Sequence, residues 1–291
     1  MHTVKSVVVT GASSGIGKAT ALLLAQHGWR VFAAVRKPAD ARALEAESDR
    51  LETLLLDVTG PDSIAAAAQE VSRRLEGRGL DGLFNNAGIG TTAPVEYMPL
   101  PQLREIFEVN LFGQIATIQA FLPLLRISRG RIINSGSVGD HITPPFAGAL
   151  AASKAAFASM SSALRLELRT QGIKVCVLEP GAIATPAAEK TLGGVEQTIA
   201  AWPQEGALLY GDAMRTVART FSRKEQAGSP PEVVAAAVER ALTDPNPRTR
   251  YPAGKDSRRL ALLARFLPEK LLDRAILRAF GLNQPFLKSA R

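Results

Sequence analysis

The sequence has few of the residues that build disulfide frameworks and metal sites. Its 291 residues include one cysteine, Cys176, and three histidines, His2, His27 and His141. A single cysteine excludes an internal disulfide and any cysteine-based metal centre. The histidines are too scattered along the chain to indicate a zinc site. We therefore expect no bound metal.

The chain also lacks the long apolar runs of membrane-inserted proteins. No stretch of about 18 or more consecutive apolar residues occurs, so we expect no membrane-spanning helix. A strand-like run, Val4–Val9, begins almost at once, without the positively charged and long apolar segments of a signal peptide. The expected location is the cytoplasm.

Net charge is absent from most of the chain. Lys and Arg outnumber Asp and Glu by 35 to 27, a formal net charge of +8. The excess lies in residues 248–291, which hold 11 basic and 3 acidic residues, whereas residues 1–247 hold 24 of each. A neutral main body argues against a nucleic-acid-binding protein, which usually carries a basic stripe on its main domain.

The composition is that of a globular protein, with 46% hydrophobic and 21% charged residues, and it excludes disordered, collagen-like and coiled-coil chains. Short apolar runs alternate with helix-like segments. The strand candidates are Val4–Thr10, Val31–Val35, Thr53–Leu56, Gly82–Asn85, Arg131–Asn134 and Lys174–Leu178. The helix candidates are Ile16–His27, Ser63–Glu76, Leu103–Arg126 and Ala151–Gln171. This alternation predicts right-handed βαβ units and a doubly wound parallel α/β sheet.

We expect a single domain with two additions. Residues 1–254 form the sheet domain. Within it, residues 186–230 are less periodic and contain Gly193, Gly194, Pro203 and Gly211, which predicts an excursion from the sheet that forms a helical lid over a pocket. Residues 255–291 form a basic C-terminal extension with amphipathic helices.

A glycine-rich segment, Gly11–Gly17, lies between the first strand and the first helix. Gly11 permits a tight turn, Gly15 lets a pyrophosphate approach the backbone, and Gly17 lets the helix and strand pack closely. The N-terminus of the following helix then faces the phosphates. Because strand, loop and helix follow one another in the first βα unit, we interpret the segment as a dinucleotide site rather than a plain turn.

The spacing TGxxxGIG of Thr10–Gly17 resembles that of the short-chain dehydrogenase/reductase family, which has a Rossmann-type fold. Further motifs follow in the family's order: Asn85-Asn86-Ala87-Gly88, Asn110, Ser137, Lys154 and Pro180-Gly181 with Thr185. The resemblance covers roughly residues 4–254, and the segment 179–186 looks like the retinol and steroid dehydrogenase-like branch. It implies hydride transfer between a nicotinamide cofactor and a carbonyl or alcohol.

The resemblance also implies which residues contact the cofactor. They are Gly11, Ser13, Ser14, Gly15, Ile16 and Gly17 in the glycine loop, Asp57 and Val58 beside the adenine, Asn86, Ala87 and Gly88 along the cofactor, Lys154 at the ribose, and Pro180, Gly181, Ile183 and Thr185 towards the nicotinamide.

NAD-preferring members of the family place an acid at the end of the second strand. Here that position is Val35, followed by Arg36 and Lys37, and the Arg36 guanidinium can pair with a 2′-phosphate. We therefore predict NADP(H) as the cofactor. The alternative is that Arg36 is only a solvated loop cation.

One residue of the family's catalytic set, a tyrosine, is absent from this chain. By the resemblance, Ser137 orients the carbonyl oxygen and Asn110 helps to hold Lys154, which lowers the pKa of a proton-transferring tyrosine four residues before it. Leu150 stands at that position, and Ser137 precedes it by 13 residues, the family's usual spacing. The alignment is therefore not shifted, and we expect carbonyl reduction to be weakened by about 10²- to 10⁴-fold.

Two side chains are candidates for a replacement acid. His141 lies four residues after Ser137 and titrates in the required range. Tyr210 lies in the lid region. The alternatives are a pocket-lining or solvent-facing loop position for His141 and helix-surface packing for Tyr210. Neither Tyr97 nor Tyr251 is an obvious substitute.

Four interpretations of Leu150 remain open from the sequence. The chain can bind NADPH but barely reduce carbonyls, or it can reduce an enone or imine that needs no tyrosine proton. It can also catalyse a non-redox isomerisation or cyclisation, or act as a non-enzymatic cofactor sensor or interaction protein. Because Ser137, Asn110, Lys154 and the nucleotide loop are present, we favour an NADP(H)-dependent reductase scaffold with altered chemistry.

Apolar residues follow both Ser137 and Thr185 along the chain. They are Ile142, Pro144, Pro145, Phe146, Ala187, Leu192, Ile199, Trp202, Leu208 and Leu209. Their placement predicts a hydrophobic small-molecule substrate. In this family the helices 103–126 and 151–171 form dimer or tetramer faces, so the resemblance implies a homodimer or homotetramer.

The C-terminal extension has an amphipathic pattern. Apolar residues recur at near-helical spacing, with Pro268 interrupting the run: Leu260, Leu263, Leu267, Leu271 and Ile276. Basic residues can occupy the other side: Arg259, Lys270, Arg274 and Arg278. Such a helix can rest weakly on an anionic membrane, or its apolar side can cover the body or its pocket. We favour the second interpretation, because members of this branch carry similar extensions.

Overall fold

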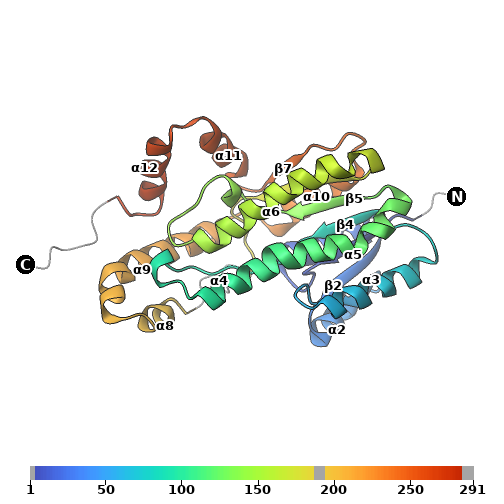
Figure 1. Ribbon diagram of the computed structural model, residues 1–291, viewed down its shortest axis with the longest axis horizontal. Coiled ribbons are helices and arrows are strands. Elements are labelled where there is room, and N and C mark those ends of the chain that lie inside the picture. Colours follow the sequence, from blue (N-terminus) through green and yellow to red (C-terminus); the bar gives the residue numbers. More distant parts are fainter. Residues whose placement is uncertain (1–3, 187–193, 284–291) are drawn as a thin grey trace, which may run out of the picture.

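The predicted strands form one sheet in the computed structural model, which describes residues 4–186 and 194–283. The strands are β1 (Ser6–Thr10), β2 (Arg30–Val35), β3 (Leu51–Leu55), β4 (Gly82–Asn85), β5 (Arg131–Ser135), β6 (Lys174–Pro180) and β7 (Arg250–Ala253). They lie in the order β3-β2-β1-β4-β5-β6-β7, and all neighbouring strands are parallel (Figure 1). The predicted doubly wound parallel sheet is confirmed.

Helices cover both faces of this sheet (Figure 1). On one face lie α1 (Gly15–Gln26) and α10 (Pro231–Thr243), and on the other lie α3 (Pro61–Leu75), α5 (Gly113–Ser128) and α6 (Gly148–Glu167). The remaining helices are α2 (Pro38–Glu47), α4 (Leu100–Phe107), α8 (Val195–Ala200), α9 (Gln204–Gln226), α11 (Ser257–Phe266) and α12 (Glu269–Ala279).

Strand β1 shows why the sequence forms a doubly covered sheet. Val7 and Val9 point to the layer of α1 and α10, whereas Val8 points to the layer of α3, α5 and α6, and all three side chains are fully buried. Successive side chains of a strand alternate between faces, so a run of valines contributes to both cores at once. The continuous apolar run therefore marks a central strand.

The helix predicted over Leu103–Arg126 is interrupted in the middle. Helix α4 ends at Phe107, and residues Glu108–Phe112 form a π-helix before α5 begins. The π-helix contains Asn110, which is fully buried. Wide turns of this type occur mostly as short insertions, often at functional sites.

The same helical segment, Leu100–Ser128, is long and apolar enough to cross a membrane by length and composition alone, with a mean hydropathy of 1.3. The sequence expectation of no membrane-spanning helix considered only uninterrupted apolar runs and missed this property. In the fold, Phe121 and Leu125 of this segment pack into the core against the sheet. A core helix of a soluble domain meets the same criterion.

Residues 186–230 were expected to form a helical excursion from the sheet. The described part, residues 194–230, holds α8 and the 23-residue helix α9, so its helical character is confirmed. Gly206 lies inside α9, where a Cβ atom would come within 2.8 Å of the Tyr97 ring. Here glycine reflects close packing rather than a turn. Strand β7 and helix α2 were also absent from the sequence-based candidates.

Candidate active site

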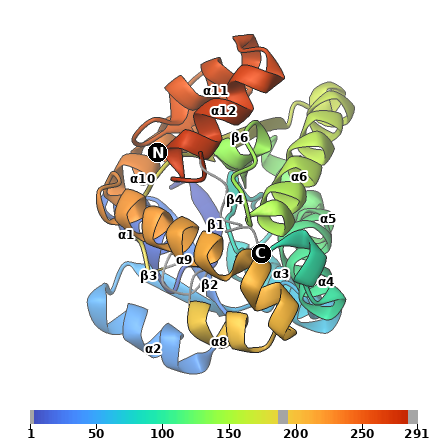
Figure 2. The same ribbon diagram turned by 90° about the vertical axis from the view of Figure 1, so that its left-hand side faces the viewer.

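The predicted site residues gather at the edge of the sheet where the strands end. The glycine loop follows β1, Asn86 follows β4, Ser137 follows β5 and Gly181 follows β6. Figure 2 views this edge, with α9 in front and α11 and α12 above it. In open parallel sheets, ligands bind at this edge beside the point where the strand order reverses, which here lies between β1 and β4.

The glycine loop has the geometry predicted for a phosphate cradle. Gly11 and Gly15 have φ values of +64° and +55°, a conformation that favours glycine. A Cβ atom on Gly17 would lie 2.3 Å from the Gly11 carbonyl oxygen. Helix α1 begins at Gly15, so its first N–H groups face the loop. The residues present therefore fit a dinucleotide phosphate group.

The loop after β4 is tied to the glycine loop. The Asn86 side-chain amide donates to the carbonyl oxygen of Thr10 at 3.0 Å, and the Thr10 hydroxyl accepts from the backbone N–H groups of Asn86 and Ala87. Thr185 lies against Gly15 from the other side, with its Cβ 3.3 Å from where a glycine Cβ would stand. These contacts bring three separate cofactor motifs together, as predicted.

The residues predicted to surround the adenosine end are also close to one another. Arg36 is exposed directly after β2, and no carboxylate follows that strand. Asp57 accepts hydrogen bonds from the Thr59 backbone and hydroxyl, which lower its pKa, and the positive charge of Arg36 lowers that pKa further. The Val58 side chain is buried in the core.

Asn110, in the π-helix, forms side-chain hydrogen bonds with Ile89 and Ser153. Its side-chain nitrogen donates to the Ile89 carbonyl (2.8 Å) and the Ser153 hydroxyl (3.0 Å), and its oxygen accepts from the Ile89 N–H (2.9 Å). A Cβ atom on Gly88 would lie 3.2 Å from this oxygen and 3.6 Å from the Lys154 ammonium nitrogen. Asn110 thus holds the Gly88 segment beside Lys154.

Ser137 and Lys154 lie at the end of β5. The Ser137 hydroxyl accepts from the Gly139 N–H (2.9 Å), while Asp140 accepts from the Ser137 N–H (3.1 Å). The Lys154 ammonium donates to the Ser135 carbonyl at 2.7 Å. Burial lowers the pKa of Lys154 to about 8, and burial together with the Glu179 charge raises that of Asp140 to about 6.

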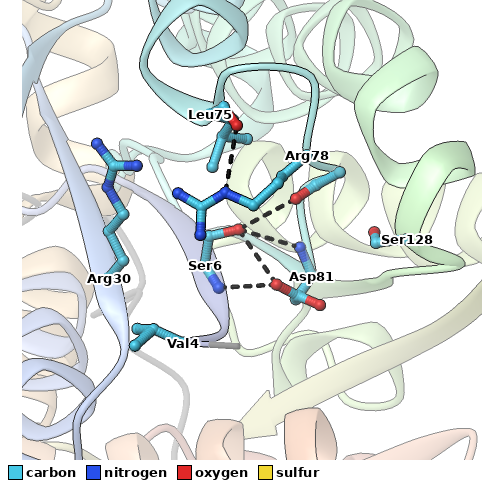
Figure 3. Close-up of a pocket in the computed structure, with 8 residues that line it drawn as sticks. Val4, Ser6, Arg30, Leu75, Arg78, Asp81 and Ser128 are labelled. Atoms are coloured by element: carbon cyan, nitrogen blue, oxygen red, sulfur yellow. Dashed lines mark hydrogen bonds between the residues drawn. The ribbon is translucent and has the colours of Figure 1, made fainter. Parts of the chain in front are cut away.

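Ser137, Leu150 and Lys154 line one cavity of about 470 Å³. Its other walls come from the loop after β4, the end of α9, and the two C-terminal helices. The volume falls in the range of small-molecule sites, about 300–1,000 Å³. A smaller cavity at the opposite edge of the sheet (Figure 3) is crossed by hydrogen bonds that join Ser6 to Asp81 at the start of the strands.

The C-terminal extension forms a wall of this cavity, in agreement with the favoured interpretation. Leu260, Leu263 and Ile276 line it, whereas Leu271 is 48% exposed. Arg259, expected on the solvent side, also lines the cavity. Further lining residues were not predicted, because nothing local distinguishes them from ordinary helix residues: Phe221, Lys224, Glu225, Leu272 and Phe280.

The apolar residues expected around the substrate divide into two groups. Ile142 and Pro144 line the cavity. Phe146 and Trp202 belong instead to an aromatic cluster with Tyr97 and Tyr210. Leu208 is 75% exposed, Ile199 is buried, and neither they nor Pro145 and Leu209 line this cavity. Ala187 and Leu192 lie outside the described residues.

Neither candidate replacement acid lines the cavity in the described structure. The His141 ring nitrogen Nε2 lies 2.9 Å from the buried Glu179 carboxylate, which also pairs with Arg250. The Tyr210 hydroxyl donates to Glu96 at 2.7 Å, and this contact raises its pKa. These contacts agree with a loop position for His141 and with helix-surface packing for Tyr210, rather than with a role as the replacement acid.

Known proteins match this chain along most of its length. Residues 5–194 match the short chain dehydrogenase family. Rat 17-beta-hydroxysteroid dehydrogenase type 6 is 37% identical over 275 residues, and human retinol dehydrogenase 5 is 37% identical over 276 residues. Each alignment covers 92% of this chain and 86% of the relative.

Solved structures agree with this assignment. A short-chain dehydrogenase from Streptomyces avermitilis is 30% identical, with a TM-score of 0.74 and 97% of both chains covered. A Burkholderia cenocepacia short chain dehydrogenase in complex with NADP is 24% identical, has a TM-score of 0.71, covers 97% of this chain and 98% of its own, and shares the fold. This chain therefore belongs to the short-chain dehydrogenase family, and it is an oxidoreductase by fold whose nucleotide site takes a nicotinamide cofactor.

Proposed function

We propose that the protein is an NADP(H)-dependent reductase for a hydrophobic substrate, with the family's carbonyl chemistry impaired or altered at Leu150. The observation that carries this proposal is the shared cavity of Ser137, Leu150 and Lys154. A leucine side chain has no proton to transfer. The proposed site therefore has the family's serine and lysine positions but no phenol, and two of the residues assigned to the cofactor, Lys154 and Gly181, line the same cavity.

The remaining polar groups define what the site can do. A nicotinamide cofactor, held by the glycine loop and Lys154, would supply a hydride. Ser137 orients the substrate's acceptor atom, while Lys154 binds the ribose and keeps a positive charge at this end of the cavity. Asn110 positions Lys154 through the Gly88 segment. The other cofactor contacts are those assigned by the family motifs.

This arrangement suits substrates whose reduction does not form an alkoxide. A ketone gains a negative oxygen that must be protonated, which is the step a tyrosine serves. An iminium group accepts a hydride and becomes a neutral amine. An enone gives an enolate that Ser137 and the nearby ammonium can stabilise until its α-carbon takes a proton from water, which completes the saturated ketone. We therefore propose enones and imines ahead of simple ketones.

The proposal is tested by following cofactor oxidation and product together. With NADPH and a panel of hydrophobic enones, imines and ketones, we expect one NADPH oxidised for each product formed, with the ketones slowest. The measurement is absorbance of NADPH alongside chromatographic quantification of product. Turnover without NADPH oxidation would instead support isomerisation or cyclisation, and binding without turnover would support an inactive variant.

Arg36→Ala is expected to weaken NADPH binding by about 10- to 100-fold, because charge-assisted hydrogen bonds contribute about 1.5–3 kcal/mol. NADH has no 2′-phosphate, so its binding should change little. Dissociation constants from fluorescence titration measure both effects. Lys37→Ala, at the next exposed position, is the matched control. Equal losses for the two cofactors, or tighter NADH binding by the unaltered protein, would contradict NADP(H) specificity.

A further inference from the structure

Glu225 is an acidic side chain in the wall of the substrate cavity. It lies in the last turn of α9, beside Phe221 and Lys224, which also line the cavity. One carboxylate oxygen, Oε2, is buried and has no hydrogen-bond partner among the described residues. Burial raises the pKa of this carboxyl group to about 7. A buried polar atom without a partner is costly, so its presence calls for a physical explanation.

The position of Glu225 is set by the backbone around it. Its carbonyl oxygen accepts from the Gly228 N–H at 2.9 Å, and the next residue, Ser229, donates to the Ala182 carbonyl at 3.0 Å. Ala182 lines the cavity directly after β6. The carboxylate therefore belongs to the α9 and β6 side of the cavity, whereas Ser137 and Lys154 come from β5 and α6.

The charges around Glu225 indicate which ligand group suits it. The charged side chains of the same cavity are Lys224 on its own helix, Asp256 and Arg259 at the start of α11, and Lys154 on α6. Lys255 lies nearby, with its ammonium on the Ala227 carbonyl. Cations outnumber anions here, so a cationic ligand group is disfavoured, whereas a neutral hydroxyl can donate to the carboxylate without that repulsion.

We propose that Glu225 is a specificity-determining residue that accepts a hydrogen bond from a hydroxyl group of the substrate, away from the reacting centre. This inference rests on the proposed function, since it takes the cavity as the substrate site. The substrate class is an apolar carbonyl, enone or imine compound with a second, alcoholic group. Oε2 is already enclosed in the wall of the cavity, so a ligand would meet the part of the carboxylate that lines the cavity. A purely apolar ligand would leave the whole carboxylate without a partner, whereas a hydroxyl supplies one.

The experiment measures equilibrium binding to the NADP⁺-loaded protein, so that no hydride transfer is needed. The probes are 2-decalone and the epimers of 6-hydroxy-2-decalone. Isothermal titration calorimetry measures the dissociation constant of each. We expect the unaltered protein to bind one hydroxylated epimer about 10- to 100-fold more tightly than 2-decalone. Glu225→Leu should remove this preference while binding 2-decalone at least as tightly, which shows that the variant is folded.

Two further variants complete the test. Glu225→Gln retains an acceptor oxygen without the charge and should keep part of the preference. Glu105→Leu replaces an exposed glutamate on α4, outside the cavity, and should keep all of it. The absence of a hydroxyl preference in the unaltered protein, or its persistence in Glu225→Leu, would overturn the proposal.

The outcome is separable from that of the proposed reductase function. A Glu225-dependent hydroxyl preference without NADPH oxidation would support the binding role and refute the reductase. Stoichiometric NADPH oxidation without any hydroxyl preference would support the reductase function and refute the binding role of Glu225. Failure of all the decalones to bind would overturn the role of Glu225, because this cavity would then not recognise apolar ring compounds.

Discussion

Leu150→Tyr is expected to increase NADPH-dependent reduction of hydrophobic ketones by about 10²- to 10⁴-fold in kcat/KM, the range of a positioned acid–base group. Positions 150 and 154 lie on the same face of α6. Both line the cavity with Ser137, and a tyrosine introduced there would direct its hydroxyl into existing space. The Lys154 ammonium would favour the ionised phenol and lower its pKa.

Leu150→Phe is the control for this experiment. It supplies the aromatic ring without the hydroxyl, so it should leave ketone reduction at the level of the unaltered protein. A similar gain in both variants would assign the effect to cavity shape rather than to proton transfer. If Leu150→Tyr reduces none of a panel of ketones, the absence of the phenol does not explain the chemistry of this site.

Gly17→Ala is expected to lower the free energy of unfolding by about 3 kcal/mol, at the upper end for overpacking. Alanine normally stabilises a helix relative to glycine. Here its methyl group would lie 2.3 Å from the Gly11 carbonyl oxygen and 2.7 Å from the Asn86 amide nitrogen. The nearest atom belongs to the backbone and cannot rotate away, so the loop must move.

The same displacement should weaken NADPH binding by about 100-fold, because the N–H groups that face the phosphates move with the loop. Urea unfolding and fluorescence titration measure the two effects. Gly60→Ala is the matched control, since its Cβ would meet Ser63 at 3.4 Å and the Asp57 carbonyl oxygen at 3.8 Å, both ordinary contacts. A Gly17→Ala protein as stable as Gly60→Ala, with unchanged NADPH affinity, would refute the cradle assigned to this loop.

Much of the fold was predictable because its signals are local. The valines of β1, the glycines after it and the spacing from Ser137 through Leu150 to Lys154 lie within short stretches of chain. Strand pairing and the family motifs then constrain where these stretches meet. The expected strands agree with the structure to within about two residues, apart from β7, whose short run Arg250–Ala253 contains a proline and has no apolar repeat.

Other features depended on packing between distant parts of the chain. Gly206 is one example: it lies inside α9, where the Tyr97 ring, from a distant part of the chain, occupies the space that a side chain would need. His141 was a candidate acid by residue type, yet it contacts Glu179 of β6 and Arg250 of β7 and does not line the cavity. Such contacts have no periodic signature in the sequence.

The sequence by itself determined the sheet, the nucleotide loop and the absence of a phenol at position 150, because each depends on residue type and short-range spacing. Only the tertiary structure decided what lines the cavity that holds Ser137, Leu150 and Lys154. It placed α11 and α12 over the cavity, put Arg259 in its wall and buried an oxygen of Glu225 without a partner. Burial and electrostatic environment arise from contacts between elements far apart in the chain, and those contacts exist only once the chain has folded.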